Sequence, residues 1–85
     1  MSNEIDFSRR GLVKLMLRMP ALRGELQALG VRNPDFLSLC GALEEASDKL
    51  ERLRQESLNY KKSEIAEYEI ICQELEQEII QMCSR

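Results

Sequence analysis

Apolar residues recur every three or four positions along three stretches of the chain, the spacing of one face of an α-helix. The stretches cover residues 12–29, 36–53 and 65–82. In each of them the steps alternate between three and four, which is the periodicity of a coiled-coil seam. The pattern therefore predicts an all-α protein, and a chain of 85 residues has room for one small domain, residues 1–85.

The clearest boundary between predicted helices falls at residues 30–35. Gly30 is placed to end one helix in the left-handed conformation that glycine adopts most easily. Asn33 can cap the next helix, with Pro34 at its first position and Asp35 near the positive end of its dipole. These signals predict that a new helix begins at Pro34.

The segment before this boundary keeps its helical spacing through Pro20. Proline removes one backbone hydrogen bond and disfavours helical geometry at the preceding residue, Met19. Two arrangements fit: a single kinked helix, or two pieces with Ser8 capping the first and Pro20 opening the second. We take a leading helix over residues 8–29, kinked at Pro20, as the prediction.

The second and third apolar stripes are out of phase, and the polar segment 55–62 separates them. One long helix with a stutter would need another chain as its partner. A turn near residues 57–63 would instead fold helices 34–56 and 63–83 into an antiparallel, coiled-coil-like hairpin, and their similar lengths favour it. The predicted hairpin seam consists of Phe36, Leu39, Leu43, Ala46, Leu50, Leu53, Ile65, Tyr68, Cys72, Leu75, Ile79 and Met82.

Further apolar residues lie outside this seam, and a two-helix hairpin cannot cover both of its faces. The leading helix could cover them, and so could self-association into a dimer or larger bundle. Left exposed, they would mark an interface for a partner protein. The candidate interface residues are Leu12, Val13, Met16, Leu17, Leu37, Ile70, Ile71 and Ile80.

Charge is unevenly distributed along the chain. Residues 1–34 carry six bases against three acids, whereas residues 35–85 carry six bases against twelve acids. From Glu64 to Ser84 there are six glutamates and no base. The basic segment could lie on this acidic helix of its own chain or of a second copy. Alternatively, it could bind an anionic membrane or another anionic surface through Arg9, Arg10, Lys14 and Arg18.

Little in the sequence points to catalysis. The chain has no histidine, which excludes Ser-His and Cys-His nucleophiles and histidine-containing zinc sites. Glu44, Asp48 and Glu51 share one helical face, which we expect to be solvated. The glycines are scattered and form no phosphate-binding loop. We therefore predict no enzyme activity, no catalytic, cofactor-binding or metal-binding residues, no cofactor and no small-molecule substrate; the acidic chain also disfavours nucleic acid.

The three cysteines, Cys40, Cys72 and Cys83, are odd in number and widely spaced, which excludes a disulfide framework and a CxxC motif. Cys40 and Cys83 could meet at one end of the hairpin. We expect free thiols in a reducing compartment, and therefore a cytoplasmic protein without a secretory signal or membrane span.

Several of these positions resemble the YdcH-like family, small bacterial helical proteins of unknown function. The resemblance runs over residues 20–83 and is carried by Pro20-Ala21-Leu22, by the helix start Asn33-Pro34-Asp35-Phe36, and by the segment from Leu75 to Met82. It implies an all-α helical hairpin and brings no activity, cofactor or binding residue. The acidic helix 63–83 and the extension 1–19 depart from the family pattern.

The sequence therefore predicts a non-enzymatic helical interaction module, such as a small adaptor, chaperone or regulator. It would bind itself or another helical protein through apolar helix faces. The alternative function is peripheral binding to an anionic membrane through the basic N-terminal segment.

Overall fold

The computed structural model of the protein describes residues 3–56 and 62–84. Nearly all of these residues are helical, and none of them is in a strand. The elements are α1 (Asn3–Arg18), the short 3-10 helix η1 (Pro20–Leu22), α2 (Arg23–Arg32), α3 (Pro34–Glu56) and α4 (Lys62–Cys83). The predicted all-α class is confirmed.

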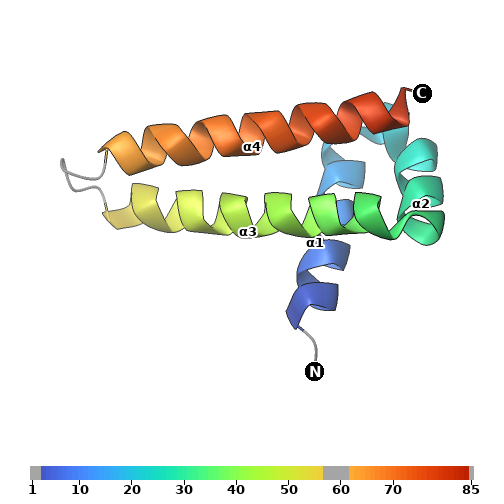
Figure 1. Cartoon of the computed structure of the whole chain (residues 1–85), viewed down its shortest axis with the longest axis horizontal. Helices are drawn as coiled ribbons and strands as arrows, with labels where there is room; N and C mark the ends of the chain where they lie inside the picture. Colours follow the sequence, from blue (N-terminus) through green and yellow to red (C-terminus); the bar gives the residue numbers. More distant parts are fainter. Residues whose placement is uncertain (1–2, 57–61, 85) are drawn as a thin grey trace.

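The two longest helices, α3 and α4, lie side by side and run in opposite directions (Figure 1). The start of α3 is the one predicted, because Pro34 is its first residue and Asn33 caps it. The Asn33 Oδ1 atom accepts a hydrogen bond from the Phe36 backbone N–H at 3.1 Å. A turn was predicted near residues 57–63, and residues 57–61 of it lie outside the described residues.

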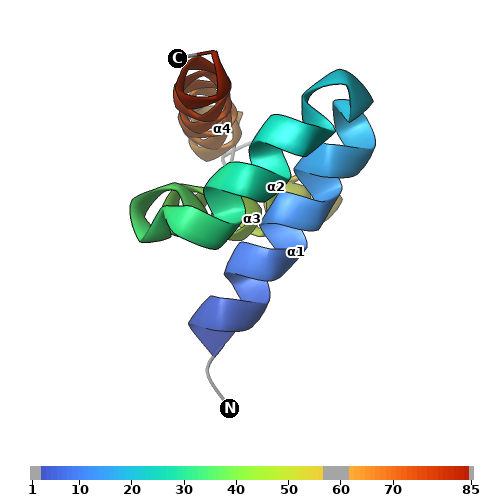
Figure 2. The same ribbon diagram turned by 90° about the vertical axis from the view of Figure 1, so that its right-hand side faces the viewer.

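The leading segment forms two helices, so the prediction of one kinked helix over residues 8–29 is wrong. The backbone of Met19, at φ −127° and ψ 70°, is not helical. Proline disfavours the helical conformation at the residue before it, and here this effect breaks the helix. The chain then folds back, so that α2 lies beside α1 (Figure 2). The first helix begins at Asn3, upstream of the predicted cap Ser8.

Gly30 does not end α2, contrary to the prediction, because the helix continues to Arg32. The glycine instead leaves room for the Leu12 side chain of α1: a Cβ atom at position 30 would lie 2.6 Å from Leu12 Cδ2. Asn33 follows as the C-cap of α2; its backbone is extended (φ −125°, ψ 100°) and still donates its N–H to the Leu29 carbonyl.

The largest cluster of buried side chains lies at one end of the α3–α4 pair, where α3 begins and α4 ends. Helix α1 crosses α3 steeply, and α2 closes that end of the molecule (Figures 1 and 2). We call residues 34–46 and 72–83, with the helices that cover them, the capped half, and residues 47–56 and 62–71 the free half. The buried cluster contains Leu15, Leu26, Phe36, Cys40, Leu43, Ile79 and Cys83.

Candidate interaction surface

Two glycines allow α1 to lie directly on α3. A Cβ atom on Gly11 would lie 2.2 Å from the carbonyl oxygen of Cys40, and one on Gly41 would lie 2.7 Å from Ser8 Oγ. Larger residues would separate the two helices, since side chains at a crossing set the distance between helix axes. An isolated glycine inside an apolar helical pattern was the sequence signal for this close approach.

Glu44 is buried beneath this crossing, contrary to the prediction that it lies on a solvated face. Its side chain is 1% exposed, and its Oε2 atom accepts hydrogen bonds from Arg10 Nε at 3.1 Å and from Lys14 Nζ at 3.0 Å. The Arg10 guanidinium also lies 3.8 Å from Asp48. The buried carboxylate is thus compensated by two bases of α1, as a charge in the interior requires. Helical spacing alone could not reveal this, because α1 covers the position from a distant part of the chain.

A further ion pair joins the end of α1 to α4, with Arg18 Nη2 2.6 Å from Glu76 Oε2. Arg10, Lys14 and Arg18 therefore all contact acidic residues of their own chain, but only Arg18 contacts α4, the acidic helix that was one expected position for the basic segment. Arg9, the fourth candidate contact for an anionic surface, is exposed. Three of the four bases that could have faced a membrane therefore form ion pairs that link α1 to α3 and α4.

The twelve predicted seam residues differ in burial between the two helices. On α3 five are buried (Phe36, Leu43, Ala46, Leu50 and Leu53) and Leu39 is half-buried. On α4 only Ile79 is buried, and the other five (Ile65, Tyr68, Cys72, Leu75 and Met82) are half-buried. Helix α3 is covered by α4 on one side and α1 on another, whereas α4 has fewer neighbours.

The eight candidate interface residues fall into two groups. Four are half-buried: Leu12, Met16, Leu37 and Ile80. The other four remain exposed, with fractional exposures of 49% for Val13, 74% for Leu17, 55% for Ile70 and 40% for Ile71. Val31 on α2 is also exposed, at 85%, and the apolar stripes did not single it out. Docking of the N-terminal helices thus covers only part of the apolar surface.

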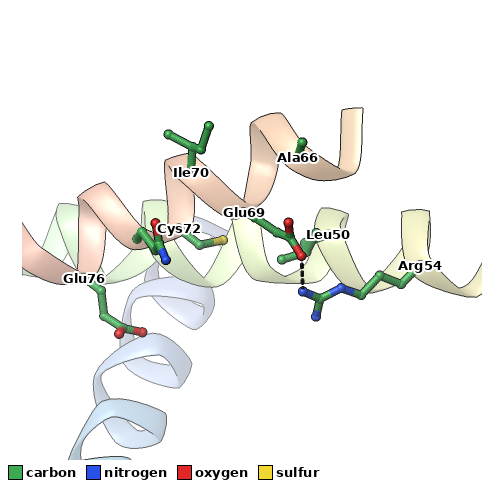
Figure 3. A pocket seen from close by; sticks show the side chains of 8 residues that line it. Leu50, Arg54, Ala66, Glu69, Ile70, Cys72 and Glu76 are labelled. Carbon is green, nitrogen blue, oxygen red and sulfur yellow. Dashed lines mark hydrogen bonds and ion pairs between the residues drawn. The ribbon is translucent and has the colours of Figure 1, made fainter. Parts of the chain in front are cut away.

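A shallow groove of about 620 Å³ runs between α3 and α4 in the region around Leu50 and Cys72. Figure 3 shows Ile70 at its edge, pointing away from α3, and Glu69 paired with Arg54 across the groove at 2.8 Å. Apolar atoms of Leu50, Ala66 and Ile70 lie among these charged and polar side chains. Such a lining suits an amphipathic helix better than a small apolar molecule.

All three cysteines are free thiols; Cys40 and Cys83 are buried in the core cluster and Cys72 is half-buried. Burial raises the pKa of the Cys40 thiol to about 11, and the proximity of Cys83 adds to this effect. Burial likewise raises the pKa of Cys83, with a smaller contribution from Glu25. Protonated, inaccessible thiols are poor nucleophiles, so Cys40 and Cys83 are packing residues.

The described residues hold no group of three or more Cys, Asp or Glu side chains that could bind a metal ion. Among the helices that the structure describes, none is long and apolar enough to cross a bilayer. Comparison of the chain with protein-family models, with curated proteins and with solved structures finds no match.

Proposed function

We propose that this protein is a non-enzymatic helical interaction module that binds itself or another helical protein through apolar helix faces. One observation carries the proposal: Val13, Leu17, Ile70 and Ile71 stay exposed although α1 and α2 are already packed on the α3–α4 pair. Exposed apolar residues that cluster on a helix face favour association, because covering them releases ordered water.

The finer features expected from the sequence fit the same proposal. In it, α3 and α4 act as an antiparallel, coiled-coil-like hairpin that presents helix faces and can extend to a multi-helix bundle by self-association. The resemblance to the YdcH-like family is compatible with such a hairpin. A cytoplasmic adaptor, chaperone or regulator in a bacterium would be of this kind.

Static light scattering on the reduced protein over a range of concentrations tests the proposal, together with binding of synthetic amphipathic helical peptides of either charge. We expect the protein either to show a mass above that of the monomer or to form a complex with a peptide. Val13→Gln/Leu17→Gln or Ile70→Gln/Ile71→Gln should weaken this association, because each pair of substitutions removes exposed apolar surface. A wild-type protein that stays monomeric and binds neither peptide would contradict the proposal.

A second candidate function is peripheral binding to an anionic membrane, and one observation favours it. Arg9, Val13 and Leu17 are all exposed and follow one another at helical spacing on α1. Co-sedimentation with anionic vesicles tests this candidate. If binding occurs and survives Arg9→Ala/Arg10→Ala/Arg18→Ala, the basic segment is not responsible. The ion pairs of Arg10, Lys14 and Arg18 within the chain favour the first function.

A further inference from the structure

Two exposed isoleucines on α4 are bracketed by two glutamates. Glu67 and Glu74 lie three or four positions from both Ile70 and Ile71, so all four side chains are neighbours on the helix surface. Both glutamates are exposed, as are both isoleucines. We call these four residues the isoleucine patch. Its apolar centre has a negative charge at each end, about 10 Å apart along the helix.

The groove beside the patch extends its apolar surface toward α3. Ile70 belongs to both, and Leu50 and Ala66 continue the apolar lining (Figure 3). Helix α1 reaches one edge of this groove, where Arg18 pairs with the lining residue Glu76. Glu67, Ile71 and Glu74 do not line the groove, so a helix that lies on the patch would adjoin the groove at Ile70.

Charge indicates what kind of helix the isoleucine patch accepts. Among the described residues, no base lies within salt-bridge distance of Glu67 or Glu74. The bases Arg10, Lys14 and Arg18 of the chain's own cationic helix α1 are already engaged with Glu44, Asp48 and Glu76. Helix α1 of a second copy therefore offers few unpaired bases to Glu67 and Glu74. A phosphate-rich surface would be repelled by the same glutamates.

We infer that the isoleucine patch binds a basic amphipathic helix of another protein. The apolar stripe of that helix would cover Ile70 and Ile71, and Lys or Arg residues about two turns apart would pair with Glu67 and Glu74. This inference rests on the proposed interaction function and assigns it a surface and a partner chemistry.

The test uses the full-length protein and a fluorescently labelled synthetic helical peptide with leucine at its heptad a and d positions and lysine elsewhere. A matched peptide with glutamate in place of lysine is the charge control. Fluorescence anisotropy should show that the lysine peptide binds and the glutamate peptide does not. Added salt should weaken the binding without abolishing it, because ion pairing is screened and apolar contact is not.

Two patch variants separate apolar contact from bulk charge attraction. Ile70→Gln/Ile71→Gln and Glu67→Gln/Glu74→Gln should each weaken binding of the lysine peptide by about tenfold or more, as expected for residues central to an interface. Both alter exposed side chains, so circular dichroism should show an unchanged fold.

Matched controls change the same residue types elsewhere. Val31→Gln removes exposed apolar surface from α2, and Glu45→Gln/Glu51→Gln removes two exposed charges from α3. Neither variant should change the affinity by more than about twofold, because none of these residues lies in the isoleucine patch. Loss of binding in a control equal to that in the patch variants would overturn the inference.

Two other results would also overturn it while leaving the proposed function standing. The first is binding of the glutamate peptide alone. The second is a homodimer, detected by light scattering, that Ile70→Gln/Ile71→Gln dissociates, because the patch would then be occupied by a second copy. Failure of the proposed function itself would look different, as a monomer that binds neither peptide.

Discussion

The two halves of the α3–α4 pair have the same heptad spacing and very different surroundings. In the capped half Ile79 is completely buried, in contact with a core built from all four helices. In the free half of the same helix, the seam residue Ile65 is only half-buried. Outside the seam, Ile70 of the free half is 55% exposed, whereas Ile80 of the capped half is half-buried. Leu50 and Leu53 of the free half are buried but lie outside the main cluster.

This difference shows that two separate properties decide helix formation and burial. The spacing of apolar residues makes each segment helical along its whole length. How deeply a residue is buried depends on how many other helices surround it, and in this protein α1 and α2 pack mainly on one end, with Arg10 of α1 reaching Asp48 at the start of the free half. The free half is therefore the part of α4 that keeps Ile70 and Ile71 exposed.

The largest effect should come from placing a charge in each half. Leu43→Asp puts an unpaired carboxylate at a buried position of the capped half and should cost about 4 kcal/mol of unfolding free energy. Ile65→Asp, at a half-buried seam position of the free half, should cost less, about 1 kcal/mol. Urea denaturation followed by circular dichroism measures both. Equal losses would remove the distinction between the halves.

Breaking the ion pairs of Glu44 should cause the next largest loss of unfolding free energy. Arg10→Met/Lys14→Met leaves the carboxylate buried without a partner and should cost about 3 kcal/mol. Glu44→Gln should cost less, because Arg10 and Lys14 are more than half exposed, at 53% and 59%, and can turn to water. In the free half, Arg54→Met breaks the exposed pair with Glu69 and should cost under about 1 kcal/mol. The same denaturation experiment ranks all three, and a stable Arg10→Met/Lys14→Met variant would contradict the role of Glu44 in holding α1.

The close crossing of α1 and α3 gives a third, somewhat smaller effect. Gly11→Ala places a methyl group against the backbone of Cys40 and should cost about 2 kcal/mol, because backbone atoms cannot move aside easily. Gly24→Ala on α2 is the matched control: its Cβ would meet nothing within 4 Å, so it should be neutral or slightly stabilising. Thermal unfolding compares them, and an unchanged melting temperature for Gly11→Ala would mean that the helices do not cross this closely.

The smallest expected effect is a difference between Cys40 and Cys72 in their rates of alkylation. Cys72 is half-buried, whereas Cys40 is buried and its pKa is raised to about 11. At neutral pH iodoacetamide should therefore modify Cys72 first, and Cys40 only after unfolding, since the thiolate is the reactive form. Mass spectrometry of peptides from the alkylated protein reads the order. Modification of Cys40 before Cys72 would contradict the placement of Cys40 in the core.

The sequence predicted features that depend on neighbouring residues and missed those that depend on distant ones. The helix start at Asn33 and Pro34 follows from local capping and was predicted correctly. The break at Met19 was one of two possible outcomes for a proline inside an apolar repeat, and the preferred one was wrong. The burial of Glu44 and the close approaches at Gly11 and Gly30 depend on how helices cross, which no local spacing specifies.

Hydrogen–deuterium exchange along α4, measured by mass spectrometry with and without the lysine peptide, tests the central claim most directly. Local opening is easiest where few buried contacts hold a helix. We predict fast exchange in residues 64–71 and slow exchange in residues 75–83 for the free protein, with the peptide slowing exchange around the isoleucine patch. Uniform protection along α4, unchanged by the peptide, would contradict the claim that the free half is an open surface for a partner helix.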